Sequence, residues 1–184
     1  MSDYYENFIK KVIDSSESNN WEDAVREWKI VDFDEDKNLS SICICGQAGL
    51  RYLYTIENLV NGKVLYPIGS SCIKKFGRED MNEYVDNNIS MFKLMNAVEE
   101  GKYISLDTKY FSRKFLKFLY NEGVFLDNEY NGYDGYKDYS FLLDMFNKNN
   151  KGSITKNQQS KIRALIMNNI RPYLSDKLKK KEKS

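Results

Sequence analysis

Three cysteines constrain the fold of this chain more than any other feature. Cys43 and Cys45 are separated by one residue and followed by Gly46, whereas Cys72 lies in the segment Gly-Ser-Ser-Cys-Ile-Lys-Lys-Phe. Between them, residues 51–69 contain two runs of alternating apolar and polar side chains, which predict a β-hairpin. Two close thiols, a hairpin and a third thiol at a helix start are typical of a chain that folds around zinc. We therefore expect all three cysteines to hold a structural Zn²⁺.

The fourth zinc ligand has no obvious donor. Zinc prefers four tetrahedral ligands, and the chain has no histidine and no fourth cysteine. Carboxylates at the acidic end of the preceding predicted strand are the nearest substitutes, and we expect Asp34 to supply the ligand. Asp32, Glu35, Asp36, a water molecule and a group from a partner remain alternatives. Three thiolates are electron-rich and no general base is placed near them, so the pattern favours a structural ion over a catalytic one.

Two other states of the cysteines remain open. They are unmetallated buried thiols, or a disulfide that joins Cys72 to Cys43 or Cys45. The acidic N-terminus shows no basic region followed by an apolar stretch, so we expect no signal peptide. No apolar run approaches the roughly 18 residues that a bilayer requires. These features predict an intracellular, reducing environment, where metal or free thiols are favoured over disulfides.

The patterns along the chain predict an α+β protein. Residues 3–18 predict a helix, and a short helix capped by Asn20 follows, with Trp21 and Trp28 on one face as core anchors. Residues 29–36 predict a strand. Asn61-Gly62 predicts a two-residue hairpin turn.

Three regions are expected along the chain. Residues 1–78 form N-terminal helices and a zinc-stapled, treble-clef-like hairpin module, in which Ser70 or Ser71 caps the helix that carries Cys72. Residues 79–178 form a helical half, in which Pro172 kinks or splits the last helix. Residues 179–184 form a disordered basic tail.

Charge and composition argue against an enzyme and in favour of a binding protein. The absence of histidine excludes Ser-His and Cys-His nucleophile pairs, and no glycine-rich phosphate loop is present. Residues 1–40 hold 11 acidic and 5 basic side chains, whereas residues 141–184 hold 3 acidic and 11 basic ones. This asymmetry predicts two surfaces of opposite potential.

A zinc-containing DNA- or RNA-binding module is the alternative function. Basic side chains follow the third cysteine, and others alternate with aromatic residues along the helix predicted at 108–121, a combination that suits a nucleic-acid backbone with stacked bases. The residues concerned are Lys74, Lys75, Arg78, Arg113, Lys114 and Lys117.

The cysteine segments also carry a family resemblance. Cys-Ile-Cys-Gly, a hairpin with Asn-Gly at its tip, and Gly-Ser-Ser-Cys-Ile, preceded by Trp-Glu-Asp-Ala-Val-Arg-Glu-Trp, resemble small zinc-binding accessory proteins of phages and mobile elements of Gram-positive bacteria. The likeness covers about residues 20–78. Some proteins of this kind are type II-A anti-CRISPR proteins, which bind the RNA-guided effector nuclease.

This resemblance implies a stoichiometric inhibitor that acts in the cytoplasm of the bacterial host cell and prevents loading of target DNA. An acidic surface would occupy a channel that normally receives phosphate. The residues expected to bind the partner are Asp32, Asp34, Glu35, Asp36, Tyr130, Tyr133 and Tyr136.

Overall fold

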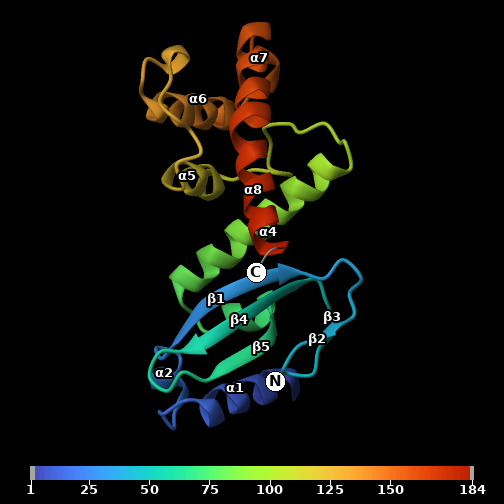
Figure 1. The fold of residues 1–184 in the computed structure, drawn as a ribbon, viewed down its shortest axis with the longest axis vertical. Coiled ribbons are helices and arrows are strands. Elements are labelled where there is room, and N and C mark those ends of the chain that lie inside the picture. Colours follow the sequence, from blue (N-terminus) through green and yellow to red (C-terminus); the bar gives the residue numbers. More distant parts are fainter. Residues whose placement is uncertain (1–2, 183–184) are drawn as a thin grey trace. The chain divides into compact units, whose positions relative to one another are not determined.

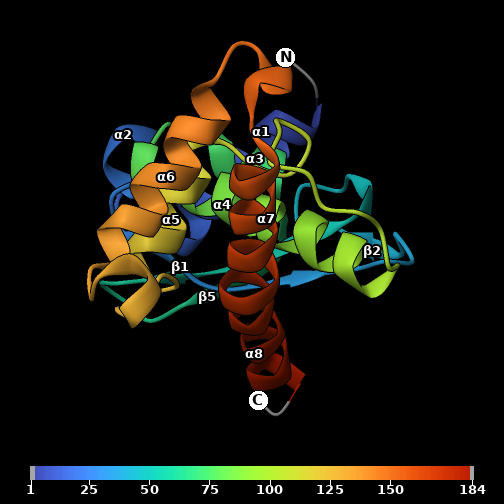
Figure 2. The same ribbon diagram turned by 90° about the horizontal axis from the view of Figure 1, so that it is seen from above.

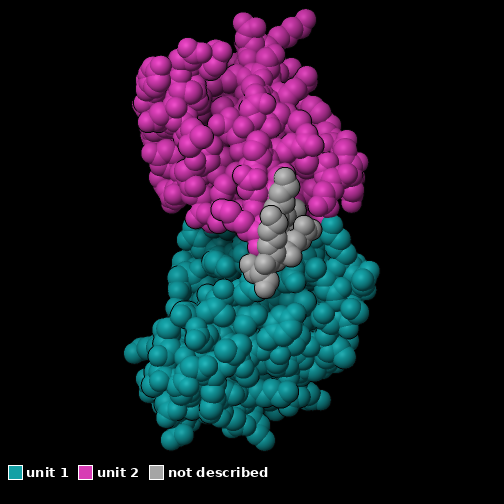
Figure 3. Space-filling model, viewed as in Figure 1, with its two compact units in different colours: residues 1–88 teal, residues 89–184 magenta. Residues whose placement is uncertain are grey.

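The computed structural model describes residues 3–182, which form an α+β protein with a small antiparallel sheet. The chain divides into two compact units, Met1–Asn88 and Ile89–Ser184 (Figure 3). The division falls inside helix α4 (Glu79–Glu99) and not at residue 78, where we expected it. The first part of α4 belongs with unit 1 because Val85 is fully buried there, and its carbonyl accepts a hydrogen bond from the Tyr54 hydroxyl (3.5 Å).

Unit 1 consists of short helices around two small sheets. A three-stranded antiparallel sheet has the order β1-β4-β5, and β2 and β3 form a separate two-stranded ladder (Figure 1). The elements preceding α4 are α1 (Asp3–Ser15), α2 (Trp21–Ala24), β1 (Trp28–Glu35), β2 (Ser41–Ile42), β3 (Ala48–Leu50), β4 (Tyr52–Asn58), β5 (Val64–Gly69) and α3 (Ser70–Lys74).

Both tryptophans pack in unit 1, but they lie on different elements. The rings of Phe8, Trp21 and Phe76 pack together, with centroids 5.4 to 6.1 Å apart. Trp28 is fully buried and begins β1, so the prediction that it shares a helix face with Trp21 is wrong. Helix α2, which Asn20 caps as expected, ends after one turn at Ala24.

Two local predictions in the hairpin region are also wrong. The connection between β4 and β5 spans residues 59–63 instead of a two-residue turn, because the Asn58 side chain accepts hydrogen bonds from the amides of Val60 and Asn61 and so widens the loop. Helix α3 has Gly69 as its N-cap and no side-chain cap, so neither Ser70 nor Ser71 plays that role. Cys72 nevertheless lies in the first turn of helix α3, as predicted.

Unit 2 is helical in the part of the chain that the structure describes. After α4 come α5 (Arg113–Asn121), the 3₁₀ turn η1 (Glu129–Asn131), α6 (Gly135–Asn147), the 3₁₀ turn η2 (Lys151–Ser153), α7 (Lys156–Leu165), the π-helical segment η3 (Ile166–Ile170) and α8 (Arg171–Glu182). Helices α7 and α8 continue one another through η3 as a single rod (Figure 1 and Figure 2). The core contains Phe115, Leu116, Leu119, Leu142 and Ile170, all fully buried.

The last helix changes its winding just before Pro172. A proline lacks the amide hydrogen and its ring crowds the carbonyl of the preceding turn, and the wider π turn of η3 relieves that conflict. The backbone is helical through Glu182, whereas the rest of the tail that we expected to be disordered, residues 183–184, lies outside the described residues. Of the helices within residues 3–182, none combines the length and the apolar character that crossing a bilayer demands.

Candidate metal centre

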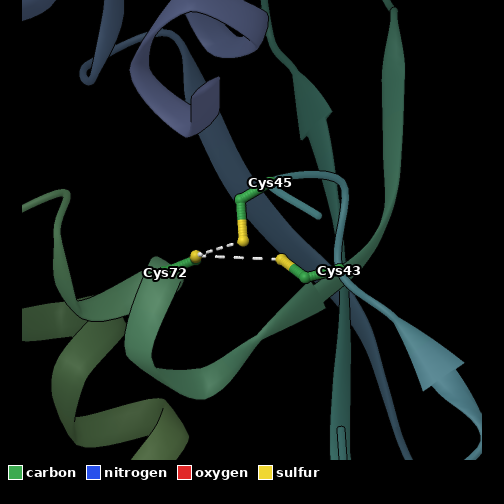
Figure 4. A group of neighbouring side chains, drawn as sticks. All are labelled: Cys43, Cys45 and Cys72. Carbon is green, nitrogen blue, oxygen red and sulfur yellow. Dashed lines mark hydrogen bonds between the residues drawn. The ribbon is translucent and has the colours of Figure 1, made fainter. Parts of the chain in front are cut away.

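The three cysteines lie together in unit 1, which confirms that they form one cluster. The Sγ atom of Cys72 is 3.7 Å from that of Cys43 and 3.6 Å from that of Cys45. All three sulfurs lie within 4.8 Å of one another. The side chains are buried, and none of them forms a disulfide. Figure 4 shows the three sulfurs pointing toward a common centre.

Two segments that are distant in sequence bring the thiols together. Cys43 and Cys45 lie in the tight connection between β2 and β3, where the Gly46 amide donates a hydrogen bond to the Cys43 carbonyl (2.8 Å). Gly46 has a φ of 100°, a conformation that side chains disfavour. Cys72 lies in α3, and the Gly69 amide at the start of that helix donates to the Cys43 sulfur (3.5 Å). This amide–sulfur contact joins the two segments directly.

The sulfur separations fit a tetrahedral metal ion. With metal–sulfur bonds of about 2.3 Å, the edge of a tetrahedron is about 3.8 Å. The observed separations of 3.6 and 3.7 Å are close to that edge, whereas a disulfide would need about 2.05 Å. Thiolates are also soft donors that select soft or borderline ions. The cluster is therefore a site that can hold a metal ion.

The structure does not bring Asp34 to the thiols. Among the described residues, the cluster of possible ligand atoms contains the three cysteines and no carboxylate. Asp34 is exposed on β1, paired in register with Leu53, and its Oδ1 accepts a hydrogen bond from the Glu35 amide (2.8 Å). Because the strand register fixes Asp34 in β1 and its carboxylate is not part of the cysteine cluster, the prediction that Asp34 supplies the fourth ligand is wrong.

The neighbouring acidic residues have other roles. Glu35 forms an ion pair with Arg51 (2.9 Å) and its side chain is 4% exposed. Asp36 accepts hydrogen bonds from the hydroxyls and amides of Ser40 and Ser41, at 2.7 to 2.9 Å. These hydroxyl bonds, with further backbone bonds, hold the pKa of Asp36 well below its usual range. Both residues thus stabilise the chain that leads into β2.

The thiols of the cluster differ in pKa because of the hydrogen bonds between them. The pKa of Cys43 is lowered to about 5, first because of its hydrogen bond with the Cys72 thiol (3.7 Å) and also because the backbone amides of Cys45 and Gly69 donate to its sulfur. The same thiol–thiol bond, together with burial, raises the pKa of Cys72. A metal ion would displace the proton from Cys72, so binding should release protons.

An acidic hollow lies on the three-stranded sheet of unit 1, and one of its lining residues, Tyr66, was not predicted from the sequence. Partial burial raises the pKa of Tyr66, and the negative charges of Asp34, Asp32 and Asp36 raise it further. Asp32 pairs in register with Thr55 across β1 and β4. The hollow has a volume of about 200 Å³ and is lined by Asp32, Phe33, Asp34, Leu53, Thr55 and Tyr66. Only the register of the strands, which the sequence does not specify, brings these residues together.

The three tyrosines predicted to bind a partner are exposed in unit 2. Tyr130 is 90% exposed, Tyr133 73% and Tyr136 52%. Tyr130 lies in η1, Tyr133 in the connection that follows, and Tyr136 in the first turn of α6. The buried Asn131 organises this segment, because its amide nitrogen donates to the Leu126 carbonyl (2.8 Å) and to an Asp138 carboxylate oxygen (2.8 Å). The exposed tyrosines thus lie on a segment whose backbone is fixed by the hydrogen bonds of Asn131.

The six basic residues of the alternative function fall into different units. In unit 1, Lys74 pairs with Asp86 (2.7 Å), the Lys75 ammonium lies 4.8 Å from the centre of the Tyr5 ring, and Arg78 donates to the carbonyls of Val25 and Trp28. These three side chains therefore stabilise unit 1. In unit 2, the residues on α5 are exposed along its polar face; they are Arg113, Lys114 and Lys117.

Comparisons with protein-family models, with curated proteins and with solved structures found no match to this chain.

Proposed function

We propose that unit 1 is a zinc-stapled module of the treble-clef kind and that the protein is a stoichiometric inhibitor of a host nucleic-acid machine. The zinc ion supplies rigidity and no chemistry: it would join the β2–β3 connection to α3 through Cys43, Cys45 and Cys72. The fourth position is left for a water molecule or a group from a partner. The separations of 3.6 and 3.7 Å between sulfurs support zinc as the ion.

The observation that carries the inhibitor proposal is the acidic hollow around Tyr66. Asp32 and Asp34 are exposed beside a tyrosine that is itself 53% exposed. Carboxylates at a regular strand spacing present negative charge much as a phosphate backbone does, and an aromatic ring adds contact area. Unit 1 as a whole holds 16 acidic and 10 basic side chains, a balance of −6. Such a surface suits a positively charged channel.

The partner that suits this surface is an RNA-guided effector nuclease of a type II CRISPR system, in the cytoplasm of the bacterial host cell. Its channel binds the phosphates of target DNA. An acidic module seated there would block DNA loading by occupying the site, without turnover. The exposed tyrosines of unit 2, Tyr130, Tyr133 and Tyr136, offer a second set of contacts.

The test uses the purified effector loaded with guide RNA. The protein should co-elute with it and abolish cleavage of target DNA at a one-to-one ratio. The double variant Asp32→Asn and Asp34→Asn should weaken inhibition by at least about tenfold, which corresponds to a loss of about 1.4 kcal/mol for the two exposed charges together. The matched control, Glu6→Gln with Glu22→Gln, removes two charges elsewhere in unit 1 and should inhibit normally. The proposal fails if the two double variants inhibit equally, or if no complex forms.

Direct nucleic-acid binding remains the second candidate, because unit 2 holds 18 basic and 11 acidic side chains, a balance of +7. In this case the contacts are Arg113, Lys114 and Lys117, which are exposed on the polar face of α5. A nucleic-acid binder would shift labelled DNA or RNA without the effector, and its affinity would fall steeply as salt rises.

A further inference from the structure

A half-open hollow of about 490 Å³ lies entirely within unit 2. Its walls come from the end of α4 with the chain that follows, and from the rod formed by α7, η3 and α8. The floor is apolar, provided by Val98, Ile104, Ile166 and Met167. Cationic and aromatic side chains stand at its rim: Lys102, Tyr103, Arg163 and Arg171. Its size is within the range of about 300–1,000 Å³ typical of small-molecule sites.

The π turn explains why two arginines eight positions apart line one hollow. In a regular α-helix, eight residues rotate the chain by about 80° beyond two full turns, which would direct Arg163 and Arg171 to different sides. The π-helical segment η3 lies between them and takes up about one extra residue in its wider turn. The two positions then behave as if seven apart and differ by only about 20°. Both side chains accordingly line the same hollow, about 10 Å apart along the rod.

The cations at the rim differ in their ion pairs. Lys102 forms an ion pair with Glu100. Neither Arg163 nor Arg171 has an ion pair with a described carboxylate, and both are exposed. The two guanidinium groups can therefore bind an anion without first breaking an ion pair with a described carboxylate. Guanidinium groups match phosphate oxygens through paired donors.

Tyr103 provides a flat surface beside these cations. Its side chain is 72% exposed, and the Arg163 guanidinium carbon lies 5.9 Å from the centre of its ring. A tyrosine that keeps this exposure has a face available for another ring, and stacking of a base on an aromatic side chain is worth about 1–3 kcal/mol. Apolar contacts from Ile104 and Met167 suit the same flat group.

From this arrangement we infer that the hollow binds a nucleoside phosphate, with the base against Tyr103 and the apolar floor and the phosphate on Arg163 and Arg171. The ligand is either a free nucleotide or one unit of a single-stranded nucleic acid, since both present the same base and phosphate. A bare phosphate would leave the apolar floor uncovered, and a bare nucleoside would leave the arginines without an anion. The combination of both groups is what the site recognises.

The experiment is calorimetric titration of the full-length protein with adenosine 5′-monophosphate, adenosine, inorganic phosphate and a 5′-phosphorylated hexamer of deoxyadenosine. Adenosine 5′-monophosphate or the hexamer should bind at least about tenfold more tightly than adenosine or phosphate. Equal affinity for the mononucleotide and the hexamer assigns the site to free nucleotide. Tighter binding of the hexamer, with affinity that falls as salt rises, assigns it to a single strand.

Substitutions in the hollow test whether the ligand binds there. Arg163→Gln, Arg171→Gln and Tyr103→Ala should each weaken the tighter ligand by about tenfold or more. Lys156→Gln, which removes a charge from an exposed position on α7 outside the hollow, should bind as the parent does. The inference is overturned if neither the mononucleotide nor the hexamer binds below about 1 mM, or if the arginine variants bind like Lys156→Gln. The outcome can be distinguished from that of the proposed inhibition, because these titrations contain no effector and the variants leave Asp32 and Asp34 unchanged.

Discussion

Replacing Glu27 with glutamine tests how a single buried carboxylate holds unit 1 together. Glu27 is 8% exposed, and its carboxylate accepts hydrogen bonds from the Ser18 amide (2.8 Å), the Glu17 amide (2.9 Å) and the side-chain amide of Asn58 (2.7 Å). Asn58 in turn organises the loop between β4 and β5. The carboxylate therefore joins the segment after α1 to the tip of the hairpin.

The cost of Glu27→Gln follows from which oxygen each donor uses. Ser18 donates to Oε1, whereas Glu17 and Asn58 donate to Oε2. A glutamine can keep its oxygen at the second position and retain two bonds, but its amide then faces the Ser18 donor. One charge-assisted bond, worth about 1.5–3 kcal/mol, is lost, and the other two become neutral and weaker. The neutral glutamine costs less to bury than a charged carboxylate, and this partly offsets the lost bonds. The free energy of unfolding should therefore fall by about 2–4 kcal/mol.

The same residue predicts a pH dependence. Burial opposes ionisation of Glu27, but hydrogen bonds from Asn58, Ser18 and Glu17 outweigh it and lower its pKa from 4.5 to about 2. Because the folded pKa is below the unfolded one, this stabilisation is fully present above about pH 4.5 and is lost as the pH falls toward 2. The difference in stability between the parent and Glu27→Gln should therefore shrink across that window.

Urea denaturation followed by tryptophan fluorescence measures this difference, because both tryptophans, Trp21 and Trp28, lie in unit 1. The titrations are run with a chelator present, so that release of metal at low pH does not contribute. Glu22→Gln, at an exposed position on α2, is the matched control and should change stability by less than about 0.5 kcal/mol. A Glu27→Gln variant as stable as this control, or a difference that stays constant between pH 5 and pH 3, would refute the reasoning.

Three further predictions concern the metal and unit 2. Cys72→Ser should reduce bound zinc, measured by elemental analysis, from about one ion per chain to none, and a parent protein without zinc would contradict the site. Gly135→Ala should destabilise unit 2 by at least about 2 kcal/mol, since a methyl group there would lie 2.0 Å from a backbone oxygen; Gly152→Ala, which meets only a side-chain atom, is the control, and hydrogen exchange of unit 2 compares them. Asn131→Asp should place a second carboxylate beside Asp138 in a buried position, so thermal unfolding should occur at a lower temperature at pH 7 and recover toward that of the parent near pH 4.

The metal cluster could be predicted from the sequence because its ligands are chemically distinctive and closely placed. Cys43 and Cys45 are separated by one residue, and Cys72 follows a hairpin that alternation and turn residues indicate. The cysteine cluster depends on local segments: a tight connection, an antiparallel pair and a helix start. Each of these has its own sequence signal, so the thiols were expected to converge.

Features that depend on contacts between distant segments could not be predicted in the same way. Glu27 lies among charged residues typical of a solvated helix, and only the position of Asn58, 31 residues later, shows that it is buried. Trp28 follows Trp21 at helical spacing, yet strand pairing with Asn58 determines its conformation. Asp34 has the right chemistry for a zinc ligand, but the register with Leu53 keeps it on the sheet. Periodicity and composition contain no information about such partners.

The opposite charges of the two units lead to a final prediction about the complex. Unit 1 has a balance of −6 and unit 2 of +7, so neither surface alone matches a partner that combines protein cations with nucleic-acid phosphates. An effector nuclease with its guide RNA presents both. If the acidic hollow binds the protein and the arginine-lined hollow binds the RNA, affinity should be higher for the guide-loaded effector than for the RNA-free one. Arg163→Gln should remove that difference and leave binding to the RNA-free effector unchanged, whereas the Asp32→Asn and Asp34→Asn pair should weaken both complexes equally. Equal affinity of the parent protein for both forms of the effector would show that the arginine-lined hollow does not bind the guide RNA, and would leave the proposed inhibition to unit 1 alone.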